Sequence, residues 1–278
     1  IVTRKLGTMK LRSSVMNEDM ISSAELSRAA CCNLGESFVT NPSVDVSYSD
    51  AATGAKQIKL LGLSGTYVQM LTENIPNYRG AAAPYGLGYV PGPWMQSIQV
   101  SKGTSSVKNG YEAITGQINV EFKKPQLPEA DWVSANLFAS TTNRYEANAD
   151  ATLKLSKRWS TSLLAHYENE TKAHDGNDDG FVDIPQVEQY NVWNRWAYMG
   201  DHYVFQAGIK ALSETRTSGQ ANHGGTMHSG DLYKVGIDTE RYEFFTKNAY
   251  IFNKEKNTNL ALILSTTLHN QDATYGRK

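Results

Sequence analysis

A regular alternation of polar and apolar residues, sustained over segments of about ten residues, most constrains what this chain can fold into. In the stretch RYEANADATLKLS, the odd-numbered residues from Tyr145 to Leu155 are apolar and the even-numbered ones from Glu146 to Lys154 are polar. Successive side chains of a β-strand point to opposite faces. The pattern therefore predicts strands with one apolar face and one polar face.

Seven such segments follow one another in the second half of the chain. We place them at residues 131–141, 145–155, 159–170, 187–199, 202–213, 240–252 and 258–270. Tight turns alternate with two long polar connections, 171–186 and 214–239, and Trp and Tyr residues gather near the strand ends. Short turns at one end, long loops at the other and aromatic strand ends favour a membrane barrel. A soluble β-sandwich is the alternative.

Residues 20–124 carry different signals, which predict a small α+β domain. Ser22 and Glu25 form a capping box that begins a short helix, and Gly35 stands where that helix is expected to end. Short β-prone segments broken by Gly, Pro and Asn follow. The adjacent Cys31 and Cys32 are too close in sequence for ordinary disulfide geometry, so we expect them to be small buried hydrophobic residues.

Composition and motifs exclude several classes of function. The net charge is −1 and no run of Lys or Arg exceeds two residues, which argues against a nucleic-acid partner. No apolar run approaches the roughly 18 residues of a membrane helix. The chain contains no GxSxG, HExxH, P-loop or CxxC motif, so we expect no enzymatic activity.

Three stretches resemble the plug domain of TonB-dependent outer-membrane receptors. They read LGESFVTNPSVDV, IKLLGLSGTYVQMLTENIP and GLGYVPGPWMQSIQVSKGTSSVKNGYEAITGQINVEFKKP. Lys102, Gly103, Gly110, Ala113 and Gly116 stand where that family carries its glycine-rich pattern. The resemblance implies an α+β plug followed by antiparallel transmembrane β-barrel strands, the N-terminal part of a 22-stranded plugged barrel.

The resemblance also implies a domain order and a set of partners. Residues 1–19 are expected to be an N-terminal coupling segment with a remnant of the TonB box at Ile1, Val2 and Thr3. Residues 20–125 are the plug, and 131–278 are the first strands of a barrel that the sequence leaves truncated. The expected partners are a TonB-type energy-coupling protein, which pairs by strand addition, outer-membrane lipids and a small-molecule ligand; a surface lipoprotein is left open. The implied location is the outer membrane of a Gram-negative bacterium.

The glycine-rich stretch NYRGAAAPYGLGYVPGPW is the candidate ligand-binding apex of the plug. We expect its aromatic residues to be exposed and to suit a large, flat, partly apolar ligand. The candidate ligand contacts are Tyr78, Arg79, Tyr85, Tyr89 and Trp94. The expected function is energy-coupled uptake of a metal chelate such as a siderophore, haem or cobalamin. A saccharide or peptide importer and a non-transporting outer-membrane adhesin or structural barrel are the alternatives.

The loop HDGNDDGFVD is a candidate calcium site. Asp175, Asn177 and Asp179 alternate and Gly180 is sixth, as in the first half of an EF-hand, although the twelfth position is Gln186. The alternative is a solvated acidic loop. The oxygen-bearing candidates for Ca²⁺, including two acids of the next long loop, are Asp175, Asn177, Asp178, Asp179, Asp183, Asp231 and Asp238. Such acidic loops resemble those of the family's cobalamin receptors, and no other cofactor is expected.

Overall fold

The computed structural model of the chain describes residues 9–10, 17–28, 32–39, 41, 43–63, 65–105, 110–125, 132–221, 232–256 and 258–277. It contains two compact units, Ile1–Lys123 and Lys124–Lys278, which are described separately below. The predicted coupling residues Ile1, Val2 and Thr3, the calcium candidate Asp231, and Cys31 lie outside the described residues.

The N-terminal unit is built on a mixed sheet of six strands in the order β1-β2-β7-β8-β5-β6. Neighbouring strands are antiparallel except β5 and β8, which are parallel. The central strands bury their apolar residues completely, among them Ile98 and Val100 of β7 and Ile118 of β8. The strands are β1 (Met9–Lys10), β2 (Asn17–Ser22), β5 (Val68–Thr72), β6 (Ile75–Pro76), β7 (Met95–Lys102) and β8 (Gly116–Phe122). Because β1 and β2 belong to this sheet, the plug fold begins before the predicted boundary at residue 20.

Short helices and a separate two-stranded sheet complete the N-terminal unit. Helix α1 (Ser23–Arg28) begins directly after Ser22, as the capping box predicts, but Gly35 does not end it: Gly35 lies inside the 3-10 helix η1 (Leu34–Phe38). The hairpin pairs β3 (Val44–Asp50) with β4 (Ala55–Leu60). The remaining 3-10 helices are η2 (Gly65–Tyr67), η3 (Gly80–Ala82) and η4 (Gly92–Trp94). Of the helices in the described ranges, none has the length and apolar character that crossing a membrane requires.

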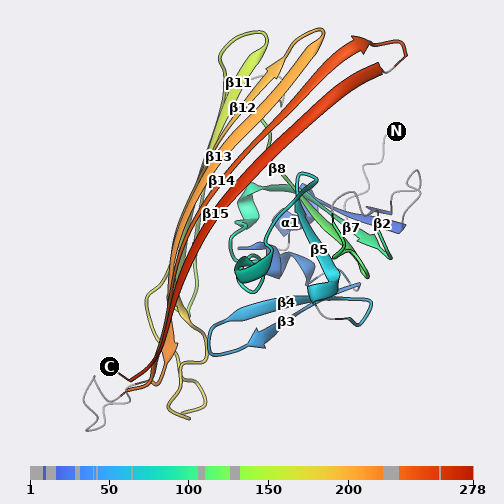
Figure 1. Cartoon of the computed structure of the whole chain (residues 1–278). Helices are drawn as coiled ribbons and strands as arrows, with labels where there is room; N and C mark the ends of the chain where they lie inside the picture. Colours follow the sequence, from blue (N-terminus) through green and yellow to red (C-terminus); the bar gives the residue numbers. More distant parts are fainter. Residues whose placement is uncertain are drawn as a thin grey trace. The chain divides into compact units, whose positions relative to one another are not determined.

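The C-terminal unit is a seven-stranded antiparallel sheet in which every strand pairs with its neighbours in sequence, from β9 to β15 (Figure 1). Both the number of strands and their positions confirm the predicted alternation. The strands are β9 (Trp132–Ala139), β10 (Arg144–Lys154), β11 (Trp159–Glu170), β12 (Gln186–Met199), β13 (Tyr203–Gly219), β14 (Lys234–Asn253) and β15 (Thr258–Gly276).

Strands β13, β14 and β15 extend further than predicted at the long-loop end of the sheet, β15 by continuing to Gly276 instead of ending at residue 270. β13 continues to Gly219 and β14 already begins at Lys234, so much of the expected loop 214–239 is strand. The pairing of Thr215 with Asp238 lies inside this extension. On β13 the extension 214–219 is polar on both faces, and on β14 the apolar Val235 and Ile237 lie on the buried face, opposite to the exposed face of Tyr242 and Phe244, so the alternation does not continue in phase. The ladder of main-chain hydrogen bonds continues without regard to side-chain polarity.

Strands β10 to β14 of the C-terminal sheet bury much of their polar face and expose their apolar face. On β10, Glu146, Asn148 and Asp150 are at most 5% exposed, whereas Tyr145 and Leu153 are 46% and 44% exposed. In a soluble sandwich the apolar face packs on the core and the polar face meets water. The exposed apolar face therefore contradicts the β-sandwich alternative and agrees with barrel strands.

Buried charges on the polar face are held by partners on the same face. Arg144 contacts Glu146 at 2.7 Å and Glu168 of β11 at 2.9 Å. The Nδ1 atom of His166 lies 2.8 Å from Oδ1 of Asn148 on β10. Pairing of this kind offsets the cost of removing charged groups from water.

Candidate ligand-binding pocket

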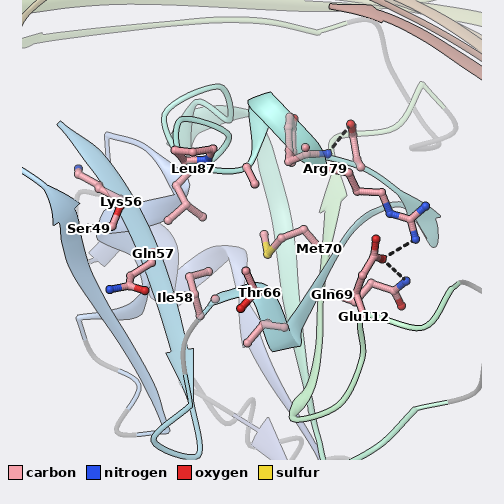
Figure 2. A pocket seen from close by; sticks show the side chains of 17 residues that line it. Ser49, Lys56, Gln57, Ile58, Thr66, Gln69, Met70, Arg79, Leu87 and Glu112 are labelled. Atoms are coloured by element: carbon pink, nitrogen blue, oxygen red, sulfur yellow. Dashed lines mark hydrogen bonds and ion pairs between the residues drawn. The ribbon is translucent and has the colours of Figure 1, made fainter. Parts of the chain in front are cut away.

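A pocket of about 440 Å³ lies within the N-terminal unit, between the β3–β4 hairpin, strand β5 and the segment 77–87. Figure 2 shows its lining side chains, which come from elements distant in sequence. The lining residues are Ser49, Lys56, Gln57, Ile58, Gly65, Thr66, Val68, Gln69, Met70, Asn77, Tyr78, Arg79, Gly80, Ala83, Pro84, Leu87 and Glu112.

The wall of the pocket is largely apolar and rigidly packed. Ile58 of β4, Val68 of β5 and Leu87 of the glycine-rich segment are each at most 5% exposed. The backbone N–H of Lys56 donates a 2.8 Å hydrogen bond to the carbonyl of Pro84, which ties the hairpin to that segment. Apolar walls with a few fixed polar groups are the usual chemistry of small-molecule sites.

The polar groups of the pocket form a connected chain. Nη2 of Arg79 donates a 2.6 Å charge-assisted hydrogen bond to Oε2 of Glu112. Nε2 of Gln69 donates to the same carboxylate oxygen at 3.3 Å, and Nε2 of Gln117 donates to Oε1 of Gln69 at 2.6 Å. This chain connects the segment 77–87 to strands β5 and β8, and the side chain of Arg79 remains 46% exposed at its end.

The backbone at Gly110 favours glycine. Its φ of +125° is a conformation that residues with a side chain rarely adopt, and an added Cβ atom would displace Nη2 of Arg79, the end of a flexible and partly exposed side chain. At Gly116 a Cβ atom would collide with the carbonyl oxygen of Ser101 on β7. Both glycines belong to the predicted plug pattern, and in both cases another group of the chain occupies the space that a side chain would need.

The expectation that the apex aromatics are exposed is wrong. Tyr78 and Tyr85 are 4% and 8% exposed, and Tyr89 and Trp94 are fully buried. The segment folds back through consecutive turns, so that the rings of Tyr78 and Tyr89 lie 6.3 Å apart inside the unit. Of the five predicted residues only Tyr78 and Arg79 line the pocket. Their role in binding a ligand stays a prediction.

Sequence analysis missed the residues that come to the pocket from other elements. Gln69 lies on β5, Lys56 on β4, and Glu112 precedes β8. A weak signal existed in the sequence, because Gln69 is a polar residue flanked by the apolar Val68 and Met70 in a β-prone segment. The structure buries Gln69 to 1% exposure. Such a residue needs a polar partner, although the strand alone cannot say which.

The acidic loop 174–184 is held by hydrogen bonds from its backbone N–H groups to its own side-chain carboxylates. The carboxylate of Asp175 accepts from the backbone N–H groups of Asp179 and Gly180, at 3.2 and 2.8 Å. Asp183 accepts from Gly176 at 2.6 Å. Asp238 lies instead on β14, where it accepts a 2.8 Å hydrogen bond from Thr215. Among the described residues no three His, Cys, Asp or Glu side chains converge as a metal site requires, and calcium stays a prediction.

Comparison with known proteins identifies related folds. Residues 10–117 match the family model described as "TonB-dependent Receptor Plug Domain". The alcaligin outer membrane receptor FauA from Bordetella pertussis has a similar structure, with a TM-score of 0.73 and 12% sequence identity over 96% of this chain and 42% of that chain. The siderophore receptor PiuA from Acinetobacter baumannii gives a TM-score of 0.69 and 13% identity over 94% and 37%.

The copper transporter OprC has the same fold, with a TM-score of 0.62 and 11% identity over 98% of this chain and 49% of that chain. The chain spans less than half the length of each of these three structures. No curated protein sequence matches the chain. At such low identity the likeness shows a shared fold of plug domain and antiparallel barrel strands.

Proposed function

We propose, from the premise that this chain carries the plug domain of a TonB-dependent receptor, that the protein takes part in energy-coupled uptake of a scarce nutrient across an outer membrane. One observation carries the proposal. A plug fold is followed in the same chain by antiparallel strands that expose their apolar face and bury their polar face. An exposed apolar face is unfavourable in water and favourable in the hydrocarbon layer of a membrane.

The proposed ligand is a metal chelate, with siderophores as the leading class. The plug pocket combines an apolar wall with the exposed guanidinium of Arg79, which suits a ligand with a flat apolar part and an anionic group. Among proteins of this fold, FauA is an alcaligin receptor, PiuA is a siderophore receptor and OprC is a copper transporter. Haem and cobalamin are further members of the chelate class.

Energy reaches the receptor through its N-terminal segment in this proposal. Ile1, Val2 and Thr3 pair by strand addition with a TonB-type protein in the periplasm, and a pull on this segment rearranges the plug. Strand β1, a two-residue edge strand paired only with β2, is the nearest described element to that segment. Few hydrogen bonds hold such an edge, so force applied there meets little resistance.

The test is uptake by cells that carry the intact receptor, with and without a functional TonB-type protein. Iron-loaded siderophores, copper, haem and cobalamin are offered separately, and binding to isolated outer membranes is measured beside uptake. Deletion of residues 1–4 should abolish uptake and leave binding nearly unchanged. Uptake that survives the deletion would indicate a passive pore. Uptake of a saccharide or peptide, but of no chelate, would replace the proposed substrate class, and binding without uptake in every strain would favour an adhesin.

A further inference from the structure

We infer that the open edge of strand β3 is a docking site for an extended, basic segment of a partner protein, which pairs with β3 by strand addition. The site is a groove of about 370 Å³ inside the N-terminal unit, between β3 and the 3-10 helix η1. It is distinct from the ligand pocket, with which it shares only Lys56. The inference goes beyond the proposed function and does not depend on it.

In the described part of the chain, β3 is paired along one edge only. Its partner is β4, in a hairpin that is separate from the six-stranded sheet (Figure 1). All five residues from Val44 to Tyr48 line the groove. Because successive side chains of a strand point to opposite faces, a groove that touches all five runs along the edge of the strand. The groove therefore gives access to the main chain of β3 as well as to its side chains.

The main-chain hydrogen bonds of β4 show which groups of β3 point to the open edge. The N–H of Lys56 donates to the carbonyl of Pro84 at 2.8 Å, away from β3, and Lys56 is directly opposite Tyr48. Hydrogen-bonded and non-hydrogen-bonded pairs alternate along an antiparallel ladder, so Val46, two positions along β3, also turns its N–H and C=O away from β4. No described residue gives these two groups of Val46 a partner.

Two polar side chains that line the groove also have atoms without a hydrogen-bond partner among the described residues. Asn41 is 3% exposed, and its Oδ1 accepts from the backbone N–H of Ser43 at 2.9 Å, but its Nδ2 is buried without an acceptor. Oγ of Ser47, on β3 itself, is buried in the same condition. Buried polar groups of native proteins are nearly always hydrogen-bonded. An occupant that bonds Asn41 and Ser47 would therefore remove a cost that the free protein carries.

An extended peptide matches this set of groups. An open strand edge offers donors and acceptors that repeat every two residues, and an extended backbone carries the complementary groups with the same repeat. Val39, on the η1 side of the groove, is 85% exposed and offers an apolar contact to a side chain of the occupant. Main-chain pairing supplies affinity in such complexes, and the side-chain contacts beside the strand supply specificity.

The distribution of charge on the hairpin favours a basic occupant. The acids of the hairpin, Asp45 and Asp50, lie on β3 and are exposed, whereas its basic residues, Lys56 and Lys59, lie on β4. Glu36 adds a carboxylate from the other side of the groove. The Nζ atom of Lys56 lies 5.4 Å from the ring centroid of Tyr48, a cation–π contact within the hairpin. The open edge is therefore the acidic side of the hairpin, and it complements a segment that carries Lys or Arg.

Fluorescence anisotropy with the intact receptor in detergent micelles tests the docking site. The probe is a fluorescein-labelled hexapeptide of alternating valine and lysine. One control peptide has glutamate in place of lysine. A second keeps the lysines but carries methyl groups on its main-chain nitrogens, so it cannot donate the hydrogen bonds of strand addition.

Variants of β3 locate the binding of the probe. Val46→Pro removes the N–H at the open edge and leaves the ladder to β4 intact, since proline is tolerated on an open strand edge. Ser47→Ala removes the Oγ atom that has no partner in the free protein. Asp45→Asn removes an acid that lines the groove, and Asp50→Asn is the matched control because Asp50 is an exposed acid of the same strand outside the groove. Denaturant unfolding of each variant is measured beside binding.

We expect the lysine peptide to bind the wild type and Asp50→Asn equally, and the Val46→Pro, Ser47→Ala and Asp45→Asn variants about three- to tenfold more weakly. Ser47→Ala should not lower the free energy of unfolding, because it removes an atom that bonds only the occupant. In the wild type, both control peptides should bind more weakly than the lysine peptide, a comparison that holds even if Val46→Pro disturbs the fold.

Three results would overturn the inference. Equal binding of the lysine peptide and its methylated form would exclude main-chain pairing. Absence of binding to the wild type would mean that other parts of the receptor cover the groove. Tighter binding after deletion of residues 1–8 would make the receptor's own N-terminal segment the occupant in place of a partner protein.

Discussion

Arg79 and Glu112 are 33 positions apart in the sequence and are joined by a 2.6 Å charge-assisted hydrogen bond at the edge of the plug pocket. The pair joins the glycine-rich segment to the residues that lead into β8, and Gln69 of β5 holds the same carboxylate oxygen. An anionic ligand at Arg79 would compete with Glu112 for the guanidinium. The pair therefore connects the most exposed cation of the pocket to the sheet beneath it.

The first prediction concerns the two partners of this ion pair. Arg79→Gln should weaken binding of an anionic chelate, because it removes the positive charge that the pocket exposes. Glu112→Gln should leave that charge in place and strengthen or preserve binding. Both changes should cost about 1 kcal/mol or less in the free energy of unfolding, because the pair is partly exposed and screened by water.

Ligand titration and denaturant unfolding of the intact receptor measure both quantities. The double variant Arg79→Gln/Glu112→Gln completes the cycle and isolates the coupling between the two side chains. Equal loss of affinity in both single variants would mean that the pair acts as a structural support rather than as a ligand contact.

The second prediction concerns Gly110. Gly110→Ala should lower the free energy of unfolding of the N-terminal unit by about 1–3 kcal/mol, mainly because alanine is strained at a φ of +125°, with a smaller cost from displacing the guanidinium of Arg79. Gly103→Ala is the matched control, since Gly103 also has a positive φ, of +94°, but nothing lies within 4 Å of its added Cβ atom. Thermal or denaturant unfolding should give a lower free energy of unfolding for the Gly110 variant than for the Gly103 variant. Equal losses would mean that backbone strain accounts for the whole effect and that displacing Arg79 costs nothing.

The third prediction concerns the depth of the sheet in the membrane. Ile209→Arg should cost about 2–4 kcal/mol of folding free energy in lipid bilayers, because Ile209 is 63% exposed on the apolar face of β13. Thr215, on the same strand and the same face, lies nearer the long-loop end and is opposite Glu188 and Asp238, so Thr215→Arg should cost about 0–1 kcal/mol. Urea unfolding from vesicles gives both values, and similar costs at the two positions would contradict a hydrocarbon layer that ends before Thr215.

The fourth prediction concerns calcium and the acidic loop. Asp175 and Asp179 accept main-chain hydrogen bonds, so an alanine at either position would disturb the loop whether or not a metal binds. Asp175→Asn and Asp179→Asn keep an oxygen acceptor and remove the charge. If Ca²⁺ orders residues 174–184 for ligand binding, it should raise ligand affinity about tenfold in the wild type, equivalent to about 1.4 kcal/mol.

The two asparagine variants should lose this response to Ca²⁺. Asp201→Asn serves as the control, because Asp201 is an exposed acid in a short turn at the other end of the strands, where it pairs with Arg158. Titration of the intact receptor with Ca²⁺ and with a chelator decides the question. Identical affinities under both conditions in the wild type would show that the loop is a solvated acidic surface.

The sequence alone determined the elements whose signals are local. Alternation with period two placed seven strands because successive side chains of a strand must point to opposite faces. The same alternation assigned Tyr145 and Leu153 to the apolar face before any pairing was known, and both are exposed on that face. Gly110 and Gly116 were recognised as part of the plug pattern because few residues other than glycine tolerate such backbone conformations or such close approach of another group.

Only the tertiary structure decided which residues meet. A glycine-rich stretch of aromatic residues is compatible with an exposed loop and with a folded one, and packing buried Tyr89 and Trp94. The pocket brings together Lys56 of β4 with Arg79 and Glu112, which lie outside the strands. The β3–β4 hairpin is held against the segment 77–87 by the hydrogen bond from Lys56 to Pro84, and no local pattern encodes that contact. Strand β13 extends through the polar residues 214–219 because main-chain hydrogen bonds to β14 stabilise it there, and side-chain periodicity carries no information about such bonds.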